Sequence, residues 1–308
     1  MALVNPMRWL MAVILCLISS TVATGCGKIS SGHPRAAAVV ASTDVWGSVA
    51  RTVAGGHVTV TSIVTGAHTD PHAYHASPAD TAAIIDAALV VYNGGGYDPW
   101  VDKMLADRPA IKSVDAYSLL ASRATTTERP PDEHVFYDLS IAKSVAALIA
   151  DRLVTIDPDN AADYQANVTE FCRGADAIAI SEHTIASDYP ASEVIVTEPV
   201  VHYLLQASGL VDRTPPAFTA THENESDPSP ADMAAALNLI NHRQVSALLV
   251  NPQKSSAATT GLQAAARRSG VPVTEVTEAL PSGTDYLTWQ RNTIDQLRAA
   301  LRSNRSPG

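Results

Sequence analysis

The chain has 308 residues, of which 46% are hydrophobic and 17% are charged, a composition typical of globular proteins and not of disordered ones. Twenty-one basic and 31 acidic residues leave a formal net charge of −10, and there is no basic run, so nucleic acid is excluded as an expected partner. The length suffices for two compact lobes. The three cysteines do not form the paired pattern of a disulfide-stapled domain.

Residues 1–25 have the pattern of a targeting segment. Arg8 provides a positive charge, and residues 9–18 form an apolar run that is too short for a comfortable transmembrane helix. Residues 23–26 read A-T-G-C and resemble a bacterial lipobox, in which a peptidase cuts before a lipid-modified cysteine. We therefore expect Cys26 to be the lipidated first residue of the mature chain, with residues 26–36 as a tether. The alternative is an ordinary secretory signal.

Short apolar runs alternate with helical patterns in the first half of the chain. Residues 37–42, 58–64 and 88–92 read as strands, and helices are expected over residues 45–53 and from Ser77 to about residue 87. This alternation predicts a mostly parallel sheet. The glycines at 94–96 lack the G-x-G-x-x-G spacing of a phosphate-binding loop, so they indicate a turn.

A long helical pattern occupies the middle of the chain, from about residue 161 to residue 186. Apolar side chains recur on one face of it: Tyr164, Val168, Phe171, Ala175 and Ile178. Two shorter helices with a break near Gly174 are the alternative, because glycine inside a helix costs about 1 kcal/mol.

The pattern of the first half returns in the second half. The sequence S-P-A-D occurs at residues 77–80 and again at 229–232. Each copy is followed by a helical pattern and by an apolar strand that ends in asparagine, at Asn93 and at Asn251. Further strands are expected at residues 193–197 and 273–276. The repeated order predicts two similar lobes with a cleft between them.

Residues 69–75 read T-D-P-H-A-Y-H and follow the strand at 58–64, where ligands of α/β proteins tend to bind. Ser77 is suited to cap the next helix, Pro78 to its first turn, and Asp80 to the third position of a capping box. A fixed helix start would hold the loop of His72 in place.

The D-P-H-x-Y element followed by S-P-x-D resembles the metal-loop signature of the solute-binding receptors of bacterial zinc and manganese ABC importers, the cluster 9 family. Residues 131–138, P-D-E-H-V-F-Y-D, are similar to the family's D-P-H-x-W-L-D-P, with Leu139 where proline is usual. Glu198 ends the strand at 193–197, where manganese-type members have glutamate and zinc-type members commonly have histidine. Glu278 follows the strand at 273–276, where the family has an acidic ligand.

The resemblance implies an α/β fold of two similar lobes, each a mostly parallel sheet flanked by helices. The lobes are expected at residues 37–160 and 188–308, joined by one long linker helix at 161–187, with a metal site in the cleft. The implied ligands are His72, His134, Glu198 and Glu278. Two imidazoles and two carboxylates suit a divalent transition metal better than calcium or magnesium. His202 is expected about one helical turn beyond Glu198 and outside the ligand set. His68, His75 and His222 are expected to be solvated loop residues, with transient metal contacts open to His68 or His75.

We expect a non-catalytic, monomeric receptor that is anchored by Cys26 and captures a divalent metal outside the membrane. It would deliver the metal to an ABC permease driven by a cytoplasmic ATPase. Zinc is favoured over manganese on raw affinity, although the ligand set is closer to manganese-type relatives. The alternatives are a secreted metallohydrolase and a surface adhesion lipoprotein. No H-E-x-x-H or G-x-S-x-G occurs, and four protein ligands would close a tetrahedral site, which argues against the hydrolase.

Overall fold

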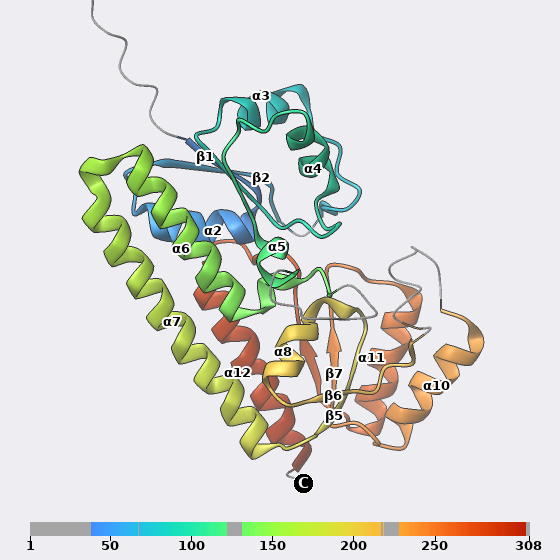
Figure 1. The fold of residues 1–308 in the computed structure, drawn as a ribbon. Helices are drawn as coiled ribbons and strands as arrows, with labels where there is room; N and C mark the ends of the chain where they lie inside the picture. Colours follow the sequence, from blue (N-terminus) through green and yellow to red (C-terminus); the bar gives the residue numbers. More distant parts are fainter. Residues whose placement is uncertain (1–37, 67, 122–130, 217, 219–227, 306–308) are drawn as a thin grey trace, which may run out of the picture. The chain divides into compact units, whose positions relative to one another are not determined.

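The computed structural model describes residues 38–66, 68–121, 131–216, 218 and 228–305 (Figure 1). The predicted signal segment, the lipidated Cys26, the tether and His222 lie outside these residues. No helix in the described ranges is both long enough and apolar enough to cross a membrane.

The first sheet has four parallel strands in the order β2-β1-β3-β4. Its strands are β1 (Ala38–Thr43), β2 (Thr59–Val64), β3 (Leu89–Tyr92) and β4 (Ser113–Asp115). The connecting helices are α2 (Asp44–Ala54), α3 (Pro78–Asp86) and α4 (Pro99–Ala106). Because β1 lies between β2 and β3, the connection from β1 to β2 and the later one to β3 lead to opposite sides of β1. This reversal places a switch point at the carboxyl end of the sheet.

The second sheet repeats this topology with the order β6-β5-β7-β8, again all parallel. Its strands are β5 (Glu193–Val196), β6 (Val211–Asp212), β7 (Ala247–Val250) and β8 (Val273–Glu275). Its helices are α8 (His202–Ala207), α10 (Pro230–Asn241) and α11 (Ala257–Ser269). The predicted pair of similar α/β lobes is therefore confirmed. The repeated motif has one local role, since Ser77 and Ser229 each accept a hydrogen bond from the N–H three residues on.

Three long helices accompany the two sheets: α6 (Leu139–Ile156), α7 (Ala161–Asp188) and α12 (Tyr286–Arg305). Helix α7 contacts both α6 and α12 (Figure 1). It is continuous over 28 residues, so the long helix is confirmed and the alternative of two shorter helices is wrong. A Cβ at Gly174 would lie 2.7 Å from the Leu287 side chain, so this glycine lets α12 approach closely.

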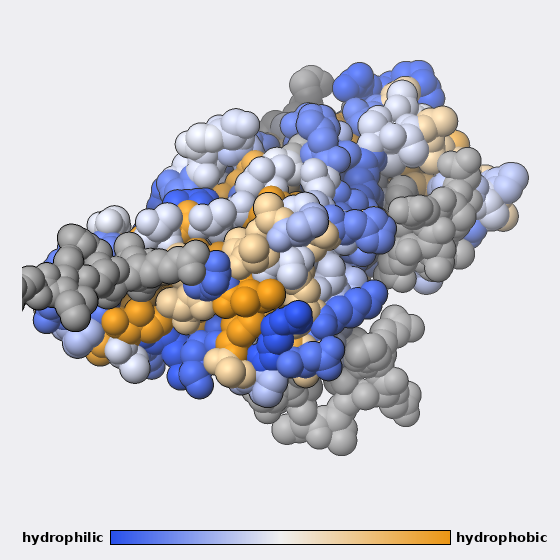
Figure 2. Space-filling view, turned by 90° about the horizontal axis from the view of Figure 1, so that it is seen from above, coloured by the Kyte–Doolittle hydropathy of each residue, from blue (hydrophilic) through white to orange (hydrophobic). Residues whose placement is uncertain are grey.

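The largest apolar cluster includes buried residues of both sheets and of α2, α6, α7 and α12. Two smaller clusters lie under the lobes' own helices, one with Ile84 and Trp100 and the other with Ile240 and Leu262. The long helices α6, α7 and α12 therefore pack in one apolar cluster with both sheets. The lobe boundaries at residues 160 and 188 stay a prediction. Figure 2 shows hydrophilic side chains over most of the face seen there, with apolar ones in small groups.

Candidate metal site

His72 lies in the loop after β2, and the start of α3 holds this loop. One carboxylate oxygen of Asp70, Oδ1, accepts the backbone N–H of His72 and lies 2.9 Å from its ring Nδ1. The Tyr74 hydroxyl donates to Asp80, whose carboxylate also accepts the N–H of Ser77 and completes the capping box. The prediction that a fixed helix start would hold the His72 loop is therefore confirmed.

His134 is held by the same device. Asp132 Oδ1 accepts the backbone N–H of His134 and lies 2.9 Å from its Nδ1. In both loops a carboxylate two residues earlier holds Nδ1, which orients Nε2 as the nitrogen available to a metal. This role of Asp70 and Asp132 was not predicted, although an aspartate stands two residues before each histidine in the sequence.

His72 contacts a second carboxylate through its other nitrogen, because Nε2 lies 2.7 Å from Oε1 of Glu133. Burial lowers the pKa of His72, but Glu133 and Asp70 outweigh it and raise the pKa to about 9. Burial also lowers the pKa of His134, and Asp132 raises it above the ordinary value. At neutral pH the His72 ring is therefore protonated between two carboxylates, and a metal must displace its Nε2 proton.

The two glutamates follow strands of the second sheet and are both buried. Glu198, after β5, accepts a hydrogen bond from the side-chain amide of Asn251 over 2.5 Å, and burial raises its pKa to about 7. Glu278, after β8, is 6% exposed, and its Oε1 has no hydrogen-bond partner among the described residues. A buried carboxylate oxygen without a hydrogen-bond partner needs an explanation, and in a site with two histidines nearby a bound cation provides one.

The asparagines that follow the two repeated strands bond to a predicted ligand in one half and to the residue before a predicted ligand, His134, in the other. Asn251 binds the Glu198 carboxylate, while the side-chain amide of Asn93 donates to the backbone carbonyl of Glu133 over 2.9 Å. The repeated asparagine thus has a similar role in both halves, because each one donates a hydrogen bond to a segment that carries a predicted ligand.

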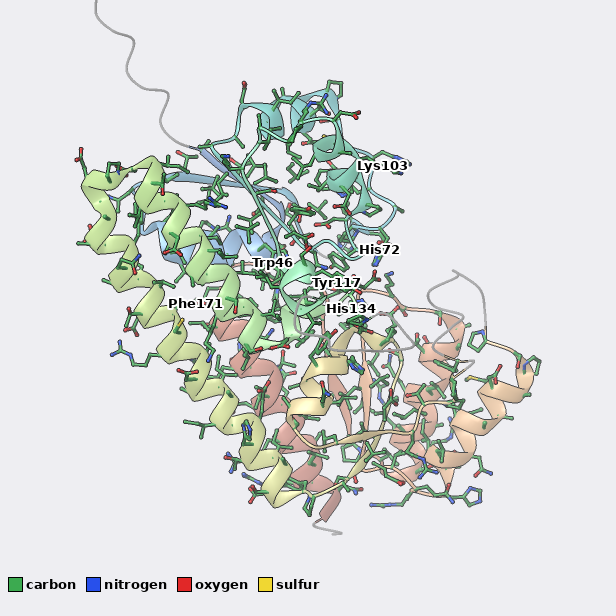
Figure 3. All side chains as sticks on the ribbon, in the orientation of Figure 1. Trp46, His72, Lys103, Tyr117, His134 and Phe171 are labelled. Atoms are coloured by element: carbon green, nitrogen blue, oxygen red, sulfur yellow. The ribbon has the colours of Figure 1, made fainter. Side chains whose placement is uncertain are left out.

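The four predicted ligands share one region without close grouping. His72 and His134 lie close together in Figure 3, with ring centres 6.5 Å apart. Two imidazoles on one ion would have ring centres about 5 Å apart. The charge of Glu278 acts on the pKa of the other three residues. Within the described ranges, no three His, Cys, Asp or Glu side chains are grouped closely enough to hold a metal.

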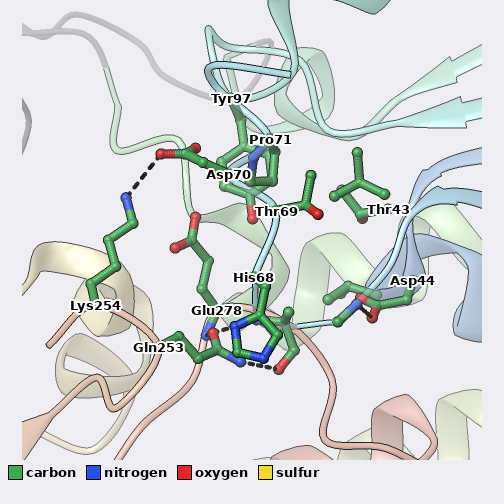
Figure 4. A pocket seen from close by; sticks show the side chains of 14 residues that line it. Thr43, Asp44, His68, Thr69, Asp70, Pro71, Tyr97, Gln253, Lys254 and Glu278 are labelled. Carbon is green, nitrogen blue, oxygen red and sulfur yellow. Dashed lines mark hydrogen bonds and ion pairs between the residues drawn. The ribbon is translucent and has the colours of Figure 1, made fainter. Parts of the chain in front are cut away.

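A cavity of about 220 Å³ is lined from both halves of the chain, and of the four predicted ligands Glu278 alone lines it (Figure 4). His68, Asp70 and Tyr97 face it from the first half, and Lys254 and Glu278 from the second. Lys254 Nζ lies 3.3 Å from Asp70 Oδ2. Burial lowers the Lys254 pKa, but nearby carboxylates, Glu278 first, raise it above the ordinary value. The cavity is therefore rich in charge of both signs.

The remaining histidines near the motifs lie elsewhere. His75 is exposed in the loop before α3. His202 is exposed at the start of α8, and its ring packs against Tyr203. Neither lines the cavity. Among the described histidines outside the predicted ligand set, only His68 lines the cavity.

A family model described as zinc-uptake complex component A, periplasmic, matches residues 39–300. The manganese-binding lipoprotein MntA of Halalkalibacterium halodurans is 24% identical over 198 residues, covering 63% of this chain and 66% of that protein. The manganese ABC transporter substrate-binding lipoprotein PsaA of Streptococcus pneumoniae is 20% identical over 315 residues, covering 96% of this chain and 99% of that protein.

Solved structures share the same fold. The periplasmic zinc-binding protein TroA of Treponema pallidum matches with a TM-score of 0.72 and 19% identity, covering 86% of this chain and 99% of that one. A manganese-bound periplasmic metal-binding protein of Candidatus Liberibacter asiaticus, an S38A mutant, matches with a TM-score of 0.69 and 21% identity over the same shares. The first title names zinc and the second manganese, and at these identities the likeness concerns the fold.

Proposed function

Because the chain belongs to the family of the periplasmic zinc-uptake complex component A, we propose that it is the extracytoplasmic metal receptor of an ABC importer. It captures a divalent transition metal and delivers it to a membrane permease that a cytoplasmic ATPase drives. In this role the metal is cargo, so the protein binds and releases it without chemistry. The receptor acts as a monomer.

One observation carries the proposal. Two histidines, each held at Nδ1 by an aspartate, lie with ring centres 6.5 Å apart beside a buried glutamate oxygen that has no hydrogen-bond partner among the described residues. We propose His72, His134, Glu198 and Glu278 as the ligands. Closure to bonding distance requires the rings to approach by roughly 1.5 Å, a shift that loop movement can supply.

Zinc is the proposed cargo, and manganese is the alternative. A site of two imidazoles and two carboxylates can satisfy zinc with four donors, and such sites generally bind zinc more tightly than manganese. The relatives named for manganese make the second metal a direct competitor.

Competitive titration of the metal-stripped mature protein with Zn²⁺ and Mn²⁺ tests both the function and the cargo. His72→Ala or His134→Ala should weaken binding at least tenfold, or about 1.4 kcal/mol, because each removes one of four donors. His75→Ala is the matched control, since its ring lies in the same loop but is exposed. Equal losses in all three variants would contradict the ligand assignment.

We also propose that a lipid on Cys26 anchors the receptor to the outer face of the cell membrane. The A-T-G-C sequence at residues 23–26 supports this anchor. Intact-mass analysis of the mature protein checks it, and an unmodified thiol or another first residue would contradict it.

Family membership argues against the secreted metallohydrolase. The alternative of a surface adhesion lipoprotein is supported only by a shared fold. The laminin-binding protein of Streptococcus agalactiae, titled a bifunctional protein with adhesin and metal-transporting activity, matches with a TM-score of 0.70 at 22% identity. A chain that binds neither metal in the titration would contradict the receptor function and leave adhesion as the alternative.

A further inference from the structure

Glu133 occupies a prepared position beside the proposed metal ligands. Its backbone carbonyl accepts a hydrogen bond from Asn93, a fully buried residue whose own Oδ1 accepts the indole N–H of Trp46. On the other side of the side chain, a Cβ at Gly96 would lie 3.3 Å from Glu133 Oε2. The absence of a side chain at Gly96 thus leaves room for the carboxylate.

The Glu133 carboxylate lies where a ligand of the same ion would lie. Oε1 is 2.7 Å from Nε2 of His72, the nitrogen that the Asp70 contact leaves for a metal. Two donors bound about 2.1 Å from one ion, at angles of 90° to 110°, stand about 3.0 to 3.4 Å apart. Replacement of the shared proton by an ion therefore requires a shift of less than about 1 Å between these two atoms.

Glu133 is also accessible to an incoming ion. Its side chain is 29% exposed and that of His72 is 33% exposed. The neighbouring Glu278 carboxylate is 6% exposed and its Oε1 has no hydrogen-bond partner within the described part of the chain. An ion that reaches His72 thus meets a partly exposed carboxylate at Glu133, within electrostatic range of the buried Glu278.

We propose that Glu133 is a fifth ligand of the metal, bound through Oε1. The assignment rests on the proposed function and deepens it. The site then offers two imidazoles and three carboxylates. Zinc is satisfied by four donors, whereas manganese suits oxygen-rich sites with more ligands. Glu133 therefore matters most for the binding of manganese.

Competition titrations of Glu133→Gln and Glu133→Asp with Mn²⁺ and Zn²⁺ test the assignment. The Gln variant still accepts the hydrogen bond of His72 but removes the anionic donor. The Asp variant keeps the charge but shortens the reach. We expect both to weaken manganese binding at least 30-fold and zinc binding less than tenfold. Glu275→Gln, an exposed carboxylate three residues before Glu278, is the control and should match the wild type.

The visible spectrum of the Co²⁺-loaded proteins gives a second readout. Four-coordinate Co²⁺ absorbs more strongly than five- or six-coordinate Co²⁺, so loss of the Glu133 ligand should intensify the bands. Manganese affinity of Glu133→Gln within twofold of wild type, or full affinity in Glu133→Asp, would overturn the ligand assignment while leaving the receptor function intact. Failure of the wild type to bind either metal would overturn the function and the ligand together.

Discussion

Single residues behind the candidate ligands determine how those ligands are held. Asp70 is the clearest case, because its Oδ1 accepts the backbone N–H of His72 and contacts the ring Nδ1, while its Oδ2 faces the Lys254 ammonium group. Lys254 also lies within electrostatic range of Glu198 and Glu278. A positive charge among three carboxylates competes with a divalent cation for the same negative potential.

Replacing Lys254 should therefore tighten metal binding. We expect Lys254→Gln to bind zinc roughly three- to tenfold more tightly, because the competing charge is removed. The pair with Asp70 is 39% and 30% exposed, so its loss should change stability little. Isothermal titration measures the affinity, with Lys103→Gln as an exposed-lysine control. A tenfold loss of affinity would mean instead that Lys254 positions Asp70.

At the scale of one element, helix α7 carries a buried charge of its own. Glu182 is 3% exposed, and its Oε1 has no hydrogen-bond partner among the residues described. Burial, with a smaller effect from Asp138, raises its pKa to about 8. The folded chain therefore favours the protonated carboxyl at neutral pH.

The raised pKa of Glu182 predicts how the stability of the folded chain changes with pH. Below about pH 4.5 both states hold the Glu182 proton, and the stability it supports is complete. As the pH rises to about 8 the unfolded state ionises first, so this stability is lost. Glu182→Gln should remove that loss. At pH 7.5 we expect the variant to have an unfolding free energy higher by on the order of a few kcal/mol and therefore a higher melting temperature.

Thermal melts of wild type and Glu182→Gln between pH 5 and pH 8 measure this effect. Glu170→Gln, on the exposed face of the same helix, is the control and should follow the wild-type pH profile. A variant that melts below wild type at every pH would mean that the Glu182 carboxylate makes a stabilising contact.

At the scale of the whole described chain, the loop that carries His134 is bonded to both halves. Asn93 in the first half binds the Glu133 carbonyl, and Tyr203 in the second half donates to the Asp132 carbonyl. Tyr137 donates to the carbonyl of Thr277, directly before Glu278. The His134 loop thus ties the two halves together, and the continuous α7 also argues for small loop shifts over a wide swing.

Glu278→Ala tests whether the second half contributes a ligand to the ion. The variant should bind metal more weakly and release it faster, while its histidines retain residual affinity. Since ligand stabilisation scales as RT ln(1 + [L]/Kd), a tenfold weaker affinity lowers the metal-induced stabilisation by about 1.4 kcal/mol. Stopped-flow release and melting shifts measure both effects. Wild-type values for both would remove Glu278 from the site.

The sequence by itself determined the alternation of elements, the helix start at Ser77 and the long α7, because these depend on periodicity and on contacts within four residues. It also placed all four candidate ligands in loops next to predicted elements. Strands β4 and β6, which have three and two residues, were not predicted, because neither lies in an apolar run long enough to indicate a strand.

Only the tertiary structure decided which side chains surround those ligands. Glu133 meets His72 across 61 residues of sequence, and Lys254 meets Asp70 across 184. No spacing rule relates such pairs, because the packing of two sheets against shared helices sets their distance. For the same reason the repeated asparagines were visible as strand ends in the sequence, but their hydrogen bonds to Glu133 and Glu198 were not.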